Sequence, residues 1–439
     1  MIEEIIKYIK SPYLNRDLLI PKNKNKLYYT VKHSDGNIKV VLPFVFKRDD
    51  LLDLNPYGLD GVVSRIIECI KEEMNRRKLN KRFPELSGNH GRRYVHLYEP
   101  FTVINSDLKM GSDLWRYDKN NYIENNNIHL LLRMILKGNP QEISNRIDNL
   151  TCELYEYINK IPFKTLEKEN VSVINQKNLR NQLDKLNLVS FIGDYSKPAR
   201  EYTAVRRHYR IAGPKKGIHI PFKTPIELNP MEVELYDGSI ITGLGIKKRE
   251  IFIITGRNAQ GKSTLLEAIE SGQDDHLIGD GREYIITTKN ISKATTGSMG
   301  MKGEDISLFF KKLPPGIKGS VNSVYGTASG SMTMAYMIQK SLKNGVDLIV
   351  IDEDNSAVNL LVSGLLSKWF EGVVPLCEII MKNRELLTSA FIITTSSLDL
   401  LTSVGDRGLY LEDHQVRYLD LDKFRKELKK YYKNLSEEI

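Results

Sequence analysis

The clearest pattern along the chain is an uninterrupted apolar run followed closely by residues at helical spacing. Ile251–Ile254 has the length and composition of a buried strand, and Thr264–Ile269 has helix-forming residues at helical spacing. Further apolar runs of strand length lie at Val346–Ile351 and Phe391–Thr394. Buried strands that alternate with helices are typical of the α/β class, and we predict an α/β fold for this part of the chain.

The first 178 residues show a different mixture of patterns. Leu27–Lys32 and Ile38–Leu42 are β-prone runs on either side of a turn signal, which predicts a hairpin. Helical spacing or helix-forming residues predict helices in three later segments, which are Val62–Met74, His129–Lys137 and Gln141–Lys160. We therefore predict that residues 1–178 form a separate mixed α/β domain.

The segment between the first apolar run and the helix after it matches the pattern G-x-x-x-x-G-K-[ST]. In this strand–loop–helix context it predicts a phosphate-binding loop, because glycines let the backbone wrap an anion and a helix N-terminus directs N–H groups at phosphates. Lys262 is expected to reach the β- and γ-phosphates of ATP, and the Ser263 hydroxyl to bind Mg²⁺. The expected nucleotide-binding residues of this loop are Gly256, Asn258, Ala259, Gln260, Gly261, Lys262, Ser263 and Thr264.

Two carboxylates follow the apolar run Val346–Ile351. Asp352 is placed to hold Mg²⁺, and Glu353 is placed to polarise the water that attacks the γ-phosphate. Glu353 and Lys262 are therefore the expected catalytic residues. Ahead of this run, Ser329-Gly330-Ser331 opens a helical segment and predicts a second anion site at a helix N-terminus.

These motifs in this order resemble the ABC-class ATPases, with Ser329–Ser331 in the signature position and Asp354–Asn359 in the D-loop position. More narrowly, the chain resembles the family of predicted single-cassette ATPases of the ABC class that have no membrane domain. The matching stretches are Leu179–Asp194, Asp237–Glu267, Gly279–Glu283, Ala328–Tyr336 and Leu348–Leu361.

The resemblance implies an ABC-type P-loop cassette, which we place at residues 179–420. The residues of the tail predict a C-terminal helix at 421–439. It also implies an ATP-dependent homodimer, in which Ser329, Gly330 and Ser331 of one copy face the phosphate loop of the other. Members of the family have been connected with RNA, so the resemblance favours a nucleic-acid partner.

Two positions depart from the family pattern. No histidine follows Phe391–Thr394, where ABC cassettes usually have a switch histidine, and Thr395–Ser397 stands there instead. Gln273 lies too near Lys262 to be the usual glutamine on the Mg²⁺ side of the site, and Asp305 has the better spacing. We therefore expect ATP hydrolysis to be slow or conditional.

Composition adds a preference about partner and compartment. The 439 residues carry a formal net charge of +9, which favours a polyanionic partner such as RNA or DNA. Three widely spaced cysteines fit a reducing cytoplasm. No apolar run approaches the length that crosses a bilayer, so we expect a cytoplasmic protein without a membrane domain.

Two basic stretches next to aromatic residues are candidate nucleic-acid contacts. One contains Arg92 and Arg93, and the other contains Arg206, Arg207 and Arg210. Each stretch is equally compatible with a solvated surface loop, because arginine beside tyrosine is common on protein surfaces.

Two smaller features allow a functional and a structural interpretation. Asp274-Asp275-His276 contains potential metal ligands, but a hydrogen-bonded loop is the simpler interpretation because no further ligand has suitable spacing. Tyr236 stands about where ABC cassettes have an aromatic residue that stacks on adenine, and it could equally pack within a hairpin.

Three classes of function fit these patterns. The favoured one is a Mg²⁺-dependent ATPase that acts as a dimer on nucleic acid, with RNA preferred. The alternative is a regulatory ATPase that acts on a protein partner without binding nucleic acid. A small-molecule kinase is disfavoured, because the signature and D-loop stretches have no part in that chemistry.

Overall fold

The chain folds around more than one hydrophobic core. Its structure, a computed structural model, describes residues 18–22, 27–34, 37–76, 121–136, 140–201, 213–214, 221–364 and 372–438. The chain divides into two compact units. Unit 1 comprises Met1–Asn175, Glu201–Gly213 and Asp275–Asp280, and unit 2 comprises the rest. One division falls within a single helix, α5 (Phe163–Gln182).

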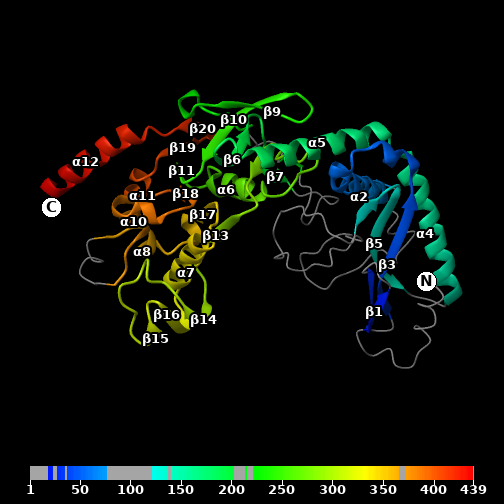
Figure 1. Cartoon of the computed structure of the whole chain (residues 1–439), viewed down its shortest axis with the longest axis horizontal. Helices are drawn as coiled ribbons and strands as arrows, with labels where there is room; N and C mark the ends of the chain where they lie inside the picture. Colours follow the sequence, from blue (N-terminus) through cyan, green and yellow to red (C-terminus); the bar gives the residue numbers. More distant parts are fainter. Residues whose placement is uncertain are drawn as a thin grey trace. The chain divides into compact units, whose positions relative to one another are not determined.

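Unit 1 is built on a five-stranded antiparallel sheet with the strand order β1-β2-β3-β5-β4 (Figure 1). Phe44 and Phe46 on β3 lie opposite Leu130 and Ile128 on β5, so alternate residues of both strands share one buried face. That face packs against the apolar sides of α2 and α4. The elements of this part are β1 (Leu18–Lys22), β2 (Leu27–Ser34), β3 (Asn37–Lys47), η1 (Asp49–Asp53), η2 (Pro56–Gly58), α2 (Leu59–Arg76), β4 (Tyr122–Glu124), β5 (Asn127–Leu136) and α4 (Pro140–Lys160).

One of the elements predicted for unit 1 differs in the structure, and two others are confirmed. The hairpin is confirmed as β2 and β3, and the helix over Val62–Met74 is confirmed within α2. His129–Lys137, however, was expected to be helical, and Asn127–Leu136 is the strand β5, paired along its whole length with β3. Leucine-rich segments favour helices weakly, and pairing with a long neighbouring strand overrides that preference.

Unit 1 contains a buried cluster of charged side chains. The Arg65 guanidinium donates hydrogen bonds to Glu169 (2.7 Å), to Glu68 (2.5 Å) and to the carbonyl oxygen of Ile278 (2.6 Å). Glu169 also accepts a hydrogen bond from the N–H of Ile278 at 3.1 Å. Burial, only partly offset by Arg65, raises the pKa of Glu169 to about 7. The cluster thereby fixes the backbone at Ile278 with both a donor and an acceptor.

The raised pKa of Glu169 predicts a pH-dependent stability. A carboxyl whose pKa is higher in the folded than in the unfolded chain stabilises the fold at low pH, and this contribution is lost as the pH rises through the folded-state value. From pH 5 to pH 8 we expect wild type to lose about 1–2 kcal/mol more unfolding free energy than Glu169→Gln. Urea unfolding of both proteins at these two pH values measures it, and equal pH dependence in both would contradict the prediction.

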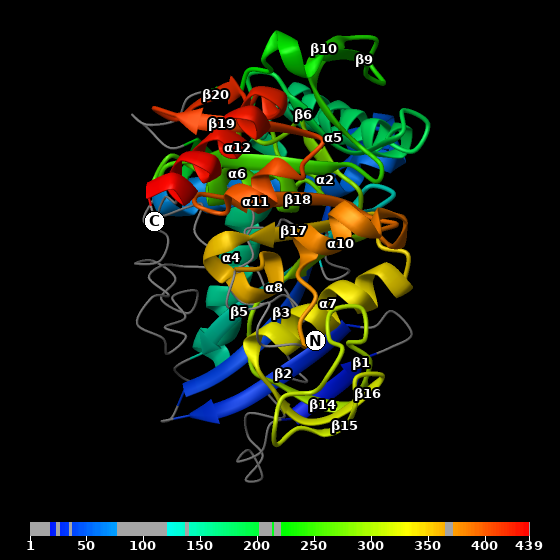
Figure 2. The same ribbon diagram turned by 90° about the vertical axis from the view of Figure 1, so that its left-hand side faces the viewer.

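Unit 2 contains a six-stranded sheet with the order β13-β17-β18-β11-β19-β20, in which all neighbours are parallel except β19 and β20 (Figure 1). Figure 2 shows β17, β18, β19 and β20 of this sheet from another side. Successive residues of β11 point to opposite faces. Phe252 and Ile254 pack with α6, whereas Ile251 and Ile253 pack with α7, α8, α10 and α11. Burial on both faces explains why the sequence of β11 is an unbroken apolar run.

Two antiparallel sheets accompany the parallel one in unit 2, with the orders β12-β6-β10-β9 and β14-β16-β15. The elements up to β16 are β6 (Leu188–Gly193), η4 (Ile226–Leu228), β9 (Met231–Glu234), β10 (Ile240–Lys247), β11 (Ile251–Gly256), α6 (Lys262–Ser271), β12 (Ile285–Thr287), β13 (Ile291–Ala294), β14 (Met299–Glu304), β15 (Lys318–Ser320) and β16 (Ser323–Ala328). Those after β16 are α7 (Gly330–Lys343), β17 (Leu348–Asp352), η5 (Glu353–Asn355), α8 (Val358–Leu361), α10 (Leu376–Lys382), η6 (Arg384–Leu386), β18 (Ala390–Thr395), α11 (Asp399–Ser403), β19 (Arg407–Glu412), β20 (Gln415–Tyr418) and α12 (Leu421–Glu438). A short pair, β7 (Arg200–Glu201) with β8 (Gly213–Pro214), lies where the chain passes between the units.

The α/β class predicted for the second half of the chain is confirmed. The apolar runs are the strands β11, β17 and β18, and the helix expected after the phosphate loop is α6. Among the residues that the structure describes, no helix combines the length and apolar composition needed to cross a membrane.

Candidate nucleotide-binding site

The predicted phosphate loop connects β11 to α6. Gly256, at the end of β11, has a φ of +140°, and a Cβ there would lie 2.5 Å from the carbonyl oxygen of Leu411 on β19. Glycine is therefore required where β19 passes this close. Ala259 and Gly261 also have positive φ values, of 61° and 101°, which curl the backbone between the strand and the helix.

The start of α6 places positive charge at the phosphate loop, from the Lys262 ammonium and from the first N–H groups of the helix. Lys262 is only 8% exposed, and its ammonium donates hydrogen bonds to the carbonyl oxygens of Gly256 (2.8 Å) and Arg257 (3.0 Å). The loop thus folds around the lysine. Among the described residues no side chain caps this helix, so its first N–H groups are directed at the loop. N–H groups and an ammonium around one concave loop form an anion site.

A cavity of about 560 Å³ lies over the loop. One part of its wall is the phosphate loop with the first turn of α6, from Asn258 to Leu265, and another part is formed by side chains that are mostly apolar. His414, at the turn between β19 and β20, lies at this wall: its N–H donates to the Gln260 side chain, and its Nδ1 is 3.2 Å from the Gln260 carbonyl oxygen. The lining residues outside the loop are Pro198, Ala199, Phe222, Asp354, Leu411, His414 and Val416.

Asp352 lies beside the first turn of α6, although it is far from it in sequence. Its Oδ1 is 3.5 Å from the Ser263 hydroxyl and accepts a 2.6 Å hydrogen bond from Thr394 on β18. Its Oδ2 accepts a 3.2 Å hydrogen bond from Asn355. Asp352 is 6% exposed, so the fold holds a buried carboxylate and a hydroxyl oxygen together at the end of the phosphate loop. Oxygen ligands of this kind suit Mg²⁺.

Glu353 follows Asp352 and is held by the loop after β18. Its Oε2 accepts hydrogen bonds from the N–H and the hydroxyl of Ser396, the latter at 2.9 Å. Its Oε1 accepts a 2.8 Å hydrogen bond from the Ser397 hydroxyl. Its own N–H donates to Thr394 at 3.2 Å. These hydrogen bonds fix the orientation of the half-buried Glu353 carboxylate, which lies directly after the end of β17.

The predicted signature residues lie at the start of another helix. Ser329 is the N-cap of α7 and its hydroxyl accepts a hydrogen bond from the N–H of Met332, as expected for a serine that opens a helix. Its hydroxyl is 3.2 Å from that of Ser331. Within the described part of the chain, the residues that line the cavity do not include Ser329, Gly330 or Ser331.

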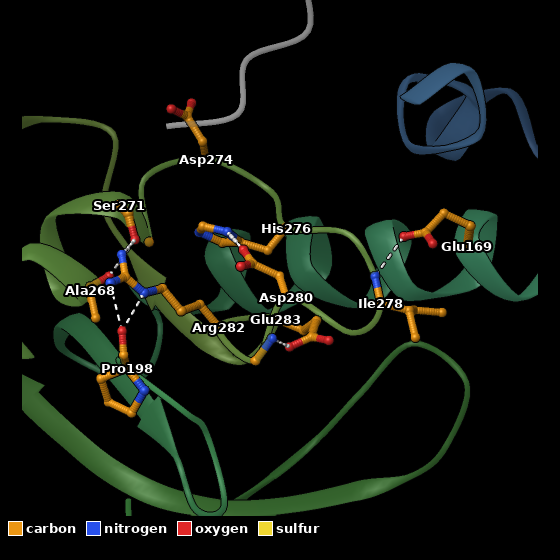
Figure 3. Close-up of polar contacts among 12 residues, drawn as sticks. Glu169, Pro198, Ala268, Ser271, Asp274, His276, Ile278, Asp280, Arg282 and Glu283 are labelled. Carbon is orange, nitrogen blue, oxygen red and sulfur yellow. Dashed lines mark hydrogen bonds and ion pairs between the residues drawn. The ribbon is translucent and has the colours of Figure 1, made fainter. Parts of the chain in front are cut away.

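The segment between α6 and β12 contains the Gly279–Glu283 motif of the resemblance. Figure 3 shows the buried Arg282 extending toward Pro198 and Ser271, and it donates to the Pro198 carbonyl oxygen from Nε (2.9 Å) and Nη2 (2.6 Å). Its Nη1 donates to the Ser271 hydroxyl at 3.1 Å. Since Pro198 lines the cavity and Ser271 ends α6, this arginine joins the cavity wall to the helix of the phosphate loop.

The acidic stretch before this motif is a hydrogen-bonded loop. His276 and Asp280 are both fully buried, and the imidazole Nδ1 contacts the Asp280 carboxylate (Figure 3). Among the residues that the structure describes, no group of three or more His, Cys, Asp or Glu side chains could hold a metal ion.

Several sequence candidates lie away from the cavity or outside the described residues. Asp305 pairs with Lys343 at the C-terminal end of α7, at 2.5 Å, and Gln273 donates to the carbonyl oxygen of Glu270. Tyr236 is 54% exposed and is not among the cavity-lining residues of the described chain. The five arginines proposed as nucleic-acid contacts, Arg92, Arg93, Arg206, Arg207 and Arg210, lie outside the described residues.

Sequence reasoning missed three roles that the structure reveals. Thr394 bonds Asp352, and Ser396 with Ser397 bonds Glu353. A run of four hydroxyl residues, Thr394–Ser397, at the end of an apolar strand is the sequence signal that could have indicated this. No comparable signal identifies His414, which reaches the cavity through the β19–β20 turn.

A profile of the family described as ABC_ATPase, P-loop domain, matches residues 162–439, which is more than half of the chain. The chain therefore belongs to the ABC ATPase family, and most of the matched residues lie in unit 2. Over 440 residues the chain is 61% identical to an uncharacterized protein of Methanocaldococcus jannaschii, covering 99% of this chain and 97% of that protein.

Solved structures that resemble the chain include two cassettes of ABC transporters. One is cbiO1 of Clostridium perfringens, with 15% identity, a TM-score of 0.26 and coverage of 43% of this chain and 84% of that one. The other is an ATP-binding cassette in its ADP conformation, with 20% identity, a TM-score of 0.26 and coverage of 40% and 82%.

Proposed function

We propose that the protein binds ATP with Mg²⁺ and hydrolyses it, as a homodimer whose two nucleotide sites lie between the copies. The observation that carries this proposal is that three groups stand at the carboxyl ends of strands of one sheet. These are the phosphate loop around Lys262, which lines the cavity, the Ser263–Asp352 oxygen pair, and the oriented carboxylate of Glu353. Anion binding, metal binding and a base are the parts that phosphoryl transfer to water requires.

Each residue has a separate role in the proposed hydrolysis. The loop N–H groups and Lys262 bind the phosphates and stabilise the charge that develops on the transferred phosphoryl group. Ser263 and Asp352 would hold Mg²⁺, which when bound neutralises charge on the phosphate oxygens. Glu353 orients the attacking water and accepts its proton.

The dimer in this proposal brings a second anion site to the nucleotide. Ser329, Gly330 and Ser331 stand at the start of α7, which runs for 14 residues from Gly330 to Lys343. Their N–H groups and hydroxyls suit the γ-phosphate of ATP that is bound to the phosphate loop of the partner copy. The motif order in the sequence supports this arrangement, and ATP-dependent dimerisation measured by light scattering tests it.

The apolar part of the cavity suits the nucleobase of ATP. His414 is held by Gln260 beside the loop, and Pro198, Phe222 and Val416 provide apolar wall around it. We predict that His414→Ala raises the KM for ATP about five- to tenfold with little change in kcat, since base stacking contributes about 1–3 kcal/mol by alanine substitution. Tyr236→Ala, away from the cavity, is the control and should leave KM unchanged. Equal KM values for wild type and His414→Ala would contradict this assignment of the base site.

For the partner, we propose a nucleic acid, with RNA preferred. The net charge of +9 and the two arginine stretches support it. ATP hydrolysis by the full chain is to be measured alone, with RNA and with DNA, each at two salt concentrations. Stimulation that weakens steeply with salt would support a nucleic-acid partner. Hydrolysis that neither polymer changes, without salt-dependent binding, would favour the alternative of a regulatory ATPase with a protein partner. The absence of ATP hydrolysis under all conditions would contradict the proposed activity.

A further inference from the structure

The carboxylate of Glu353 accepts hydrogen bonds from three donors, all of which come from two consecutive serines. These are the N–H of Ser396, the hydroxyl of Ser396 at 2.9 Å and the hydroxyl of Ser397 at 2.8 Å. Both serines are exposed, whereas the strand before them is buried throughout. Because both hydroxyls are exposed, they do not contribute to the packing of the core. Their role is therefore expected in the nucleotide-binding site, through their contact with Glu353.

The end of β18 explains why both serines reach Glu353. Along the strand, Thr394 points toward Asp352, and Thr395 points to the opposite side, where its hydroxyl is 2.9 Å from that of Thr402 on α11. The strand ends at Thr395 and α11 begins at Asp399. In the turn between them the alternation of a strand no longer applies, and Ser396 and Ser397 can face the same side.

The three donors occupy most of the hydrogen-bond acceptor positions of the Glu353 carboxylate. An ionised carboxylate offers about four acceptor positions, so about one is left for a further donor. The attacking water must donate to Glu353 if it is to transfer its proton, and it therefore has to use this last position. The donors also fix the plane of the carboxylate, since one serine bonds each oxygen. A small serine hydroxyl can rotate, so it can also follow the carboxylate as the proton arrives.

We propose that Ser396 and Ser397 are the positioning residues of Glu353, and that they direct one acceptor position of its carboxylate at the attacking water. This inference rests on the proposed function, in which Glu353 is the base. It also gives the two serines after β18 a role in a chain that has no histidine at these positions. The serines act through Glu353, so they should affect turnover rather than the affinity for ATP.

The test compares steady-state ATP hydrolysis by wild type, Ser396→Ala, Ser397→Ala and the double alanine variant. We expect kcat to fall about tenfold in each single variant and about a hundredfold in the double variant, with KM within about twofold of wild type. The conservative pair Ser396→Thr and Ser397→Thr keeps the hydroxyls and should recover most of the lost kcat. Ser403→Ala is the matched control, because that hydroxyl bonds the Leu400 carbonyl oxygen within α11 and should leave kcat unchanged.

The outcomes separate this inference from the proposed function. A double alanine variant with wild-type kcat, or one that loses activity only through KM, overturns the role of the serines. Threonine variants as slow as the alanine variants also overturn it, because the hydroxyls would then not be what matters. If wild type hydrolyses no ATP, or Glu353→Gln is as fast as wild type, the proposed function itself fails. Circular dichroism of each variant establishes that the fold is intact.

Discussion

Replacing Glu353 with glutamine is expected to reduce ATP turnover about a thousandfold, within the range usual for loss of a general base. Glutamine has the same shape, and its amide oxygen can still accept from one serine, but it cannot take the proton of the attacking water. The phosphate loop and Asp352 are unchanged, so ATP should still bind. Because hydrolysis then no longer resets the site, the variant is expected to accumulate as an ATP-bound dimer, detectable by light scattering.

An exposed glutamate of the same unit provides the control for this variant. Glu385 lies in η6, and Glu385→Gln changes the same charge without touching the cavity or Glu353. It should leave kcat and the oligomeric state as in wild type. If Glu353→Gln turns over ATP within about twofold of wild type and forms no ATP-dependent dimer, the role of Glu353 as the base is wrong.

The phosphate loop could be predicted from the sequence because all of its parts are contiguous. Gly256 must leave β11 beside Leu411, and Lys262 must follow Gly261 at the start of α6, so the spacing of these residues carries the geometry. The same holds for Asp352 and Glu353, which stand at the end of an apolar strand. In these segments the residues that carry the chemistry are the same contiguous residues that determine the local structure. The sequence alone is therefore enough to predict the site residues there.

The parts that the sequence could not supply depend on contacts between distant segments. β5 is a strand because it pairs with β3, although the leucines in its sequence permit a helix. The serines after β18 reach Glu353 because β17 and β18 are neighbours in register, with Asp352 opposite Thr394. Register between parallel strands is set by the whole sheet, and no short motif encodes it.

The Gly279–Glu283 motif illustrates a third case, in which a family motif is visible but its role is not. Its arginine is 2% exposed and lies away from the Ser263–Asp352 pair in sequence. The structure shows that it bonds the Pro198 carbonyl oxygen and the Ser271 hydroxyl (Figure 3). Arg282 thus holds the backbone at Pro198, which lines the cavity, and is not itself a lining residue. Its effect on ATP binding would therefore be indirect.

This arrangement predicts that Arg282→Ala destabilises the protein by about 3 kcal/mol, because it removes buried hydrogen bonds of a charged group and leaves a void. Without Arg282, the Pro198 carbonyl oxygen loses two donors and the cavity wall loses its tie to the end of α6. The KM for ATP should therefore also rise. Urea unfolding followed by circular dichroism measures the stability, and steady-state hydrolysis measures KM.

Two other arginine variants separate the contribution of geometry from that of charge. Arg282→Lys keeps the positive charge but replaces the planar fork by a single ammonium, so it should recover only part of the stability. Arg384→Ala removes an arginine that is 43% exposed and paired with Asp406, and surface pairs of this kind contribute about 1 kcal/mol or less. If Arg282→Ala is no less stable than Arg384→Ala, the buried arginine does not hold the cavity wall. A stability loss with unchanged KM would instead place the role of Arg282 in the fold alone, because the position of Pro198 would then not matter for ATP.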